Sequence, residues 1–178
     1  RQLFLYADAI NHLSDRTAAS APDMVDFSRR VAAQGEFFGF SAKDTLAFGA
    51  AMISAGAQSD VASTSLRNMG RALVAGKSAR KSLMGAYQAI GLSEIKTAQR
   101  MQIDAVGTTL DVMDRISKLP DWEQASVMSE FFGDEARALA PLLSQIDTLR
   151  ATLGYVADDT AYAGSVSREF ESRSKTTA

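Results

Sequence analysis

The sequence predicts an all-α fold, because apolar residues recur every three or four positions along most of the chain and strict alternation is nearly absent. Glycine, serine and proline residues interrupt this pattern at short intervals, as they do where helices begin and end. We expect an array or bundle of about eight short amphipathic helices, joined by these stops and followed by a longer polar C-terminal helix.

The first three helices have clear sequence signals. One face of the first helix is apolar and comprises Leu3, Tyr6, Ile10 and Leu13. The second begins at Ser20 and the third at Ser41, because an aspartate follows each serine at the spacing of a capping box. The second ends near residues 35–39 and the third at Gly56. The apolar run of residues 46–57 is too short to span a membrane and suits a buried helix.

Three further helices are predicted in the middle of the chain. The fourth is the clearest, because it stops at Gly76 and its apolar residues share one face: Ala62, Leu66, Met69 and Leu73. The fifth ends before Gly91. A short polar stretch separates it from the sixth, whose apolar face runs from Val106 to Ile116 and which Pro120 ends.

The last part of the chain contains two more helices and a polar tail. The seventh helix spans about residues 121–132 and closes at Gly133. Asp134 opens the eighth, where negative charge suits a helix N-terminus, and Pro141 should kink this helix or make it restart. Its apolar face continues to Leu153. From Tyr155 the sequence becomes polar, which predicts a long solvated helix.

The domain organisation expected from these patterns is one module within a longer protein. The chain opens with arginine rather than methionine and stops inside a helical pattern, as an excised piece would. We expect residues 1–19 to form an N-terminal helix continuing from the parent protein and residues 20–153 to form a helical core module. Residues 154–178 would then be a polar helical extension into the rest of that protein.

Charge is unevenly distributed although the net charge is only −2. Residues 61–100 contain seven basic residues and one acidic residue, whereas residues 101–147 contain nine acidic and three basic residues. A basic half followed by an acidic half predicts head-to-tail contact, within one molecule or between copies. The alternative is that the two halves are simply two solvated faces.

Few residues could support catalysis or metal binding. Cysteine is absent, and the single histidine, His12, is too few for a catalytic triad or a zinc site. The acidic pairs lie side by side, so on a helix their side chains diverge instead of converging on a substrate. Residues 70–78 have five residues between their glycines, where a P-loop has four, and lie on a predicted helix. We therefore expect no enzyme activity, no catalytic residue, no cofactor and no metal.

Basic residues form one part of a candidate interaction surface. Arg67 and Arg71 lie one turn apart on the second helix of the hairpin at residues 41–73, which also has the order of a helix-turn-helix. Such arginines could contact phosphates, but an antiparallel helical hairpin with an exposed arginine pair produces the same pattern. Arg80 and Lys81 extend this basic surface along the chain.

Aromatic residues form the other part of the candidate surface. Trp122, Phe131 and Phe132 are the largest aromatic concentration in the sequence, and all three lie on the predicted seventh helix. They could pack in the core of the module. Alternatively, they could anchor a neighbouring copy or another protein.

The order of several sequence blocks resembles the core region of phage tail tape measure proteins. The first block is the helix 122–132 with its Phe-Gly junction at Gly133, followed by the alanine-rich acidic helix that opens at Asp134. The second is the hairpin of residues 41–76, and the third is the lead-in Ile116-Ser117-Lys118-Leu119-Pro120. The resemblance covers about residues 10–175 and rests on the order of these blocks, since no single one is specific.

This resemblance implies a structural component of a phage or prophage tail. Tape measure proteins are elongated helical proteins that fill the growing tail tube, set its length and leave when DNA is ejected. The expected partners are other copies of the chain, tail tube and tail assembly proteins and, transiently, phage DNA, with no small-molecule substrate and no membrane contact from this segment. The expected location is the virion tail lumen, and the host cytoplasm during assembly. The alternative is a helical protein-interaction or adaptor domain with nonspecific nucleic-acid contact.

Overall fold

The computed structural model describes residues 2–176, and this part of the chain forms helices and turns without strands. Twelve α-helices and two short 3-10 helices follow one another in this order: α1 (Gln2–Arg16), α2 (Ala21–Phe37), α3 (Ala42–Ser54), α4 (Ser59–Val74), η1 (Gly76–Ser78), α5 (Lys81–Ala89), α6 (Glu94–Ile103), α7 (Ala105–Ser117), α8 (Asp121–Phe132), η2 (Asp134–Leu139), α9 (Ala140–Ser144), α10 (Ile146–Tyr155), α11 (Asp159–Tyr162) and α12 (Ser165–Thr176). The all-α prediction is confirmed, with more and shorter helices than the eight expected.

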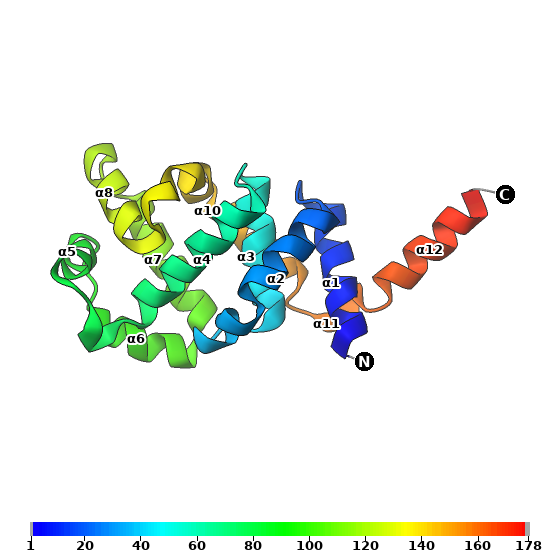
Figure 1. Ribbon diagram of the computed structural model, residues 1–178, viewed down its shortest axis with the longest axis horizontal. Helices are drawn as coiled ribbons and strands as arrows, with labels where there is room; N and C mark the ends of the chain where they lie inside the picture. Colours follow the sequence, from blue (N-terminus) through cyan, green and yellow to red (C-terminus); the bar gives the residue numbers. More distant parts are fainter. Residues whose placement is uncertain (1, 177–178) are drawn as a thin grey trace.

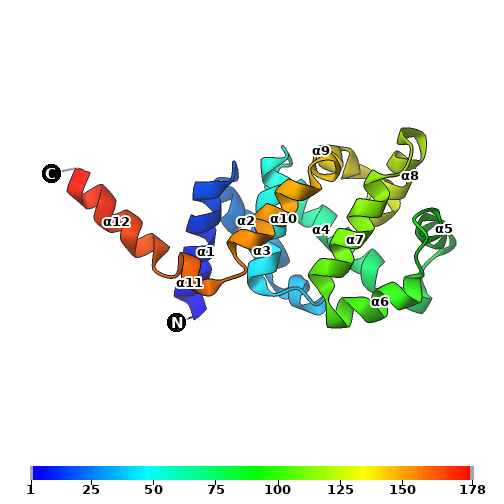
Figure 2. The ribbon, with the colours of Figure 1, turned by 180° about the vertical axis from the view of Figure 1, so that it is seen from behind.

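Helix α4 lies at the centre of an elongated array. The helices α1, α2, α3 and α10 form one half of the array, and α5 to α8 form the other (Figures 1 and 2). Helix α4 contacts members of both halves, including α2 and α3 on one side and α6 and α8 on the other. Helix α12 extends away from the body next to α1.

Helix α3 explains the apolar run seen in the sequence. Its residues Thr45–Met52 are all buried, because α1, α2, α4 and α10 surround it. Helix α4 also buries eight residues against its neighbours. The hairpin of α3 and α4 is therefore the core of the module.

Two glycines allow α2 to approach α3 and α4 closely. A Cβ atom at Gly49 would lie 2.3 Å from Cε1 of Phe27, and one at Gly70 would lie 2.2 Å from Cδ2 of Phe38. Both phenylalanines are buried, so each ring fills the notch that a glycine leaves in the facing helix. The three helices can therefore pack this closely because Gly49 and Gly70 have no side chain.

The predicted helix starts at Ser20 and Ser41 are confirmed. The Ser20 hydroxyl accepts a hydrogen bond from the Asp23 backbone N–H, and Ser41 forms a reciprocal capping box with Asp44. These bonds satisfy N–H groups that have no partner within the helix, which fixes where α2 and α3 begin.

The structure corrects three local predictions. Residues 94–103, expected to be part of a polar stretch, form α6, which Ser93 caps and which buries Thr97 and Met101. The predicted eighth helix begins as the 3-10 helix η2. The expected restart at Pro141 is confirmed, because α9 begins at Ala140 with Pro141 in its first turn, but a further break at Gln145 separates α10. The predicted long polar helix from Tyr155 is divided into α11 and α12, with Gly164 at positive φ between them.

Helix α12 is attached to α1 by side chains from the beginning of the chain. The carboxylate of Asp8 accepts hydrogen bonds from the backbone N–H groups of Gly164, at 2.8 Å, and Val166, at 3.0 Å. The Asn11 amide donates to the Ser165 hydroxyl at 2.7 Å. Asp8 is buried and caps the N-terminus of α12 from a distant position in the sequence.

No helix in the described part of the chain is long and apolar enough to span a membrane.

Candidate interaction surface

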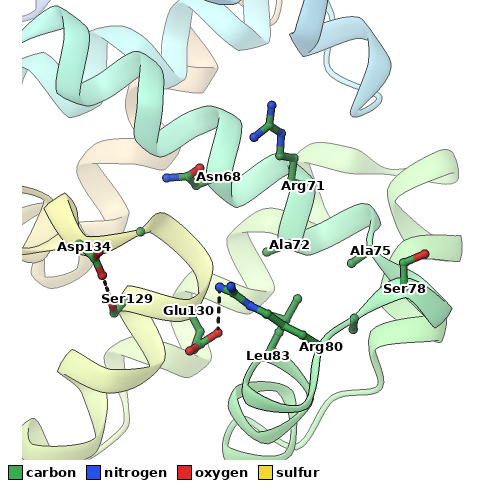
Figure 3. Close-up of a pocket in the computed structure, with 12 residues that line it drawn as sticks. Asn68, Arg71, Ala72, Ala75, Ser78, Arg80, Leu83, Ser129, Glu130 and Asp134 are labelled. Atoms are coloured by element: carbon green, nitrogen blue, oxygen red, sulfur yellow. Dashed lines mark hydrogen bonds and ion pairs between the residues drawn. The ribbon is translucent and has the colours of Figure 1, made fainter.

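A groove lies between the C-terminal half of α4, the start of α5 and the end of α8 (Figure 3). Its volume is about 560 Å³. The α4 and α5 side provides small or apolar side chains, among them Ala72, Ala75 and Leu83, with Arg71 at the rim. The α8 side provides Glu130 and Asp134. The groove thus has an apolar floor, one basic wall and one acidic wall.

Gly76 and η1 position the basic wall. Helix α4 ends at Val74, and Gly76 adopts a φ of 51°, which allows the chain to turn sharply into α5. Arg80 is the N-cap residue of α5, and its side chain reaches across to Glu130 at 3.5 Å. This ion pair is exposed on the arginine side, so it contributes little to stability and leaves Arg80 accessible.

The Phe-Gly junction at the end of α8 positions the acidic wall. Gly133 has a φ of 90°, a conformation that residues with a Cβ rarely adopt, and a Cβ there would lie 2.4 Å from Nδ2 of Asn68. The Asn68 amide donates to the Phe132 carbonyl at 3.0 Å and so joins α8 to α4. Beyond the junction, Asp134 accepts a hydrogen bond from Ser129 at 3.2 Å. Gly133 is therefore a structural position.

Buried aromatic side chains next to the Phe-Gly junction hold α5 and α8 together. Phe131 and Phe132 are each 1% exposed, and the Phe131 ring meets the Tyr87 ring edge-on, with centroids 5.0 Å apart. The Tyr87 hydroxyl donates to the Ala72 carbonyl at 2.8 Å. Burial raises the pKa of Tyr87, which keeps the hydroxyl protonated as a donor.

The candidate interaction residues occupy different environments. Arg71 and Arg80 both line the groove, and Lys81 is exposed as the first residue of α5. Arg67 is half-buried and donates to the Thr64 hydroxyl at 3.1 Å. Trp122 is 80% exposed in the first turn of α8. The core-packing interpretation therefore describes Phe131 and Phe132, and Trp122 is the member of the aromatic group that a partner can reach.

Sequence reasoning missed Asn68, Glu130 and Asp134 as members of this site. The partner of Asn68 is 64 positions away in the sequence, so no local pattern marks it. Glu130 lies one turn before Gly133 on α8, and its proximity to Arg80 depends on how α5 packs against α8. The sequence pattern that could have indicated this groove is the basic stretch followed by the acidic stretch. The basic wall of the groove comes from the first stretch and the acidic wall from the second.

The other titratable groups lie apart from this groove in the described part of the chain. No cluster there contains three or more metal-ligating side chains. His12 is buried next to the rings of Tyr155 and Tyr162. Its pKa is lowered, first by burial and then by the nearby charge of Arg16. Residues 70–78, which were compared with a P-loop, form the end of α4 and η1 without a preceding strand.

Two comparisons with known proteins gave matches. Residues 5–133 match the family model described as phage-related minor tail protein. A protein named "Probable tape measure protein" from Halomonas phage phiHAP-1 is 30% identical over 171 residues. That alignment covers 96% of this chain and 20% of the relative, so the chain spans about a fifth of the length of the curated relative it matches. No solved structure gave a significant match.

Proposed function

The chain belongs to the phage-related minor tail protein family and is similar to a probable tape measure protein, and we propose that it is a segment of the tape measure protein that sets tail length. A structural role in a phage tail follows from the family. The finer proposal is that the segment supports assembly of the tail tube and later leaves with the ejected DNA. The similarity to a probable tape measure protein over nearly the whole chain carries this proposal.

The fold favours a compact module over a stretch of extended ruler. A single helix of 178 residues would measure about 270 Å, since each residue adds about 1.5 Å along a helix. Here the longest helix, α2, has 17 residues, and the chain reverses repeatedly at glycines with positive φ. A module of this kind adds little length per residue and presents a shaped surface to partners.

The proposed location is the lumen of the virion tail, after assembly in the host cytoplasm. The proposed partners are other copies of the chain and the proteins of the tail tube and its assembly machinery. The proposed role is structural because the chain belongs to a family of phage tail proteins, and its candidate surface offers a groove with paired charges and an exposed tryptophan. These features suit protein contacts.

Tail length after an in-frame deletion of residues 1–178 from the parent gene tests the proposal. Electron microscopy should show that tails are missing or have scattered lengths, because a compact assembly module has been lost. Uniform tails shortened by about 270 Å would instead mean that the segment works as extended ruler. Tails of normal length would overturn the proposal. Supplying the intact gene in trans should restore normal tails, which controls for effects on neighbouring genes.

A further inference from the structure

We propose that the groove between α4, α5 and α8 receives the segment Asp121-Trp122-Glu123 from a second copy of the chain. The inference rests on the proposed self-association and assigns a surface to it. Both elements belong to the described part of the chain.

Trp122 is one of several large apolar side chains exposed on the described surface, and it is the one that lies between two acidic residues. Its side chain is 80% exposed, whereas the other aromatic residues of α8, Phe131 and Phe132, are buried. An indole left in water loses the apolar burial that makes tryptophan a frequent anchor of protein interfaces. Asp121 and Glu123 flank it, and no ion pair with a described residue occupies either carboxylate. The segment is thus an exposed aromatic side chain between two free negative charges.

The groove complements this segment in shape and in chemistry. Its floor of Ala72, Ala75 and Leu83 offers apolar contact to an indole ring, and its volume of about 560 Å³ lies in the range of small binding pockets. Arg71 and Arg80 form the basic wall, and Arg80 already pairs with Glu130 across the groove. Asp121 and Glu123 are two positions apart on α8, so their side chains point roughly 200° apart and one of the two carboxylates can face this wall.

The acidic wall of the groove also suits the tryptophan. The indole N–H is a donor without acceptor capacity, and the carboxylates of Glu130 and Asp134 are acceptors. A tryptophan lying across the floor can therefore donate to this wall while one of its two acidic neighbours faces the arginines. The same wall disfavours DNA, because Glu130 and Asp134 would repel its phosphates.

The tryptophan cannot occupy the groove of its own molecule. Trp122 lies in the first turn of α8, and the groove begins at Ser129 and Glu130 near the end of the same helix. About seven residues at 1.5 Å each separate the two by roughly 10 Å along a rigid helix. Occupation of the groove by Trp122 therefore requires a second copy.

The charges that remain after folding favour contact between copies. Two ion pairs join the basic stretch of residues 61–100 to the acidic stretch of residues 101–147 in the described structure, Arg80–Glu130 and Arg100–Asp111. Arg71 and Lys81 have no acidic partner there. The head-to-tail attraction predicted from the sequence is thus only partly satisfied inside one molecule.

Sedimentation equilibrium of the 178-residue chain tests the inference first. The wild-type chain should self-associate, and Trp122→Ala should weaken association by at least about tenfold, as expected for a central anchor. Phe170→Ala is the matched control, because Phe170 is 74% exposed on α12, away from the groove, and this change should leave association unaltered. A wild-type chain that stays monomeric at high concentration, or equal effects of the two changes, would overturn the inference.

A charge exchange then tests the pairing itself. The double variants Arg71→Glu/Arg80→Glu and Asp121→Lys/Glu123→Lys should each be monomeric, because each brings like charges together. Mixing them should restore association, since every groove then meets a segment of opposite charge. Arg29→Glu/Arg150→Glu, at exposed sites on α2 and α10, should associate like the wild type. Failure of the mixture to associate would overturn the inference.

Two further outcomes separate the possible causes of failure. Binding of duplex DNA that depends on Arg71 and Arg80, in a chain that does not self-associate, would assign the groove to nucleic acid and overturn the inference. Normal self-association with no effect of Trp122→Ala would overturn this surface only. The tail-length experiment decides the proposed function separately, because it does not depend on which surface joins the copies.

Discussion

Replacing Gly49 with alanine should destabilise the fold even though alanine favours helices. The new Cβ would lie 2.3 Å from Cε1 and 2.5 Å from Cδ1 of Phe27, whereas carbon atoms in contact prefer about 3.5–4.0 Å. Phe27 is fully buried, so the ring or the whole of α2 must move by more than 1 Å, a rough estimate from these distances. Overpacking of a well-packed core lowers the free energy of unfolding by about 1–3 kcal/mol.

The gain in helix propensity sets the net magnitude. Alanine is favoured over glycine inside a helix by about 1 kcal/mol, which offsets part of the overpacking cost. Subtracting this gain leaves an expected net loss of about 0–2 kcal/mol in the free energy of unfolding, which lowers the Tm by up to roughly 8 °C for a chain of this size. Urea denaturation followed by far-UV circular dichroism measures the first quantity, and calorimetry measures the second.

Two glycines without neighbours provide the controls. A Cβ at Gly85 in α5 or at Gly154 in α10 would meet no atom within 4 Å, so Gly85→Ala and Gly154→Ala should raise stability by about 0.4–1 kcal/mol. Trimming the facing ring with Phe27→Leu should recover part of the Gly49→Ala loss in the double variant. The packing argument fails if Gly49→Ala proves as stabilising as Gly85→Ala.

Two further predictions concern the groove and the buried histidine. Gly133→Ala should lower the free energy of unfolding by about 2 kcal/mol or more, because it combines a disfavoured φ with a clash against the Asn68 amide. An unchanged free energy of unfolding in urea would contradict this. Stability should also fall as the pH drops from about 7 to about 5, because burial lowers the pKa of His12 in the folded chain and the unfolded chain binds a proton near the ordinary value of 6.5. His12→Phe should remove this pH dependence in urea titrations at the two pH values, and a slope that persists would show that another group causes it.

Local signals in the sequence predicted many helix boundaries. The capping residues Ser20 and Ser41 and the stops at Gly56 and Gly133 act within one or two turns of their own positions. Such interactions can be read from spacing alone, because both partners lie close together in the chain. The bounds of α8 at residues 121–132 agree with the sequence prediction for this reason.

Non-local contacts explain what the sequence left hidden. Helix α6 has few large apolar residues and depends on burial of Thr97 and Met101 against the rest of the array, so its periodicity is weak. The groove depends on the Asn68 amide donating to the Phe132 carbonyl of α8. The sequence left open whether Phe131 packs in the core or lies on a surface, and its contact with Tyr87 of α5 decides for the core. In each case the deciding partner lies on another helix.

The capping of α12 by Asp8 has a consequence for the order of folding. The two ends of this contact are separated by 156 positions or more in the chain, which makes it among the most non-local bonds in the module. During synthesis at about 5–20 residues per second, α1 leaves the ribosome roughly 8–30 s before its cap partners exist. The backbone N–H groups of Gly164 and Val166 can therefore reach the Asp8 carboxylate only after all the helices from α1 to α11 have been synthesised.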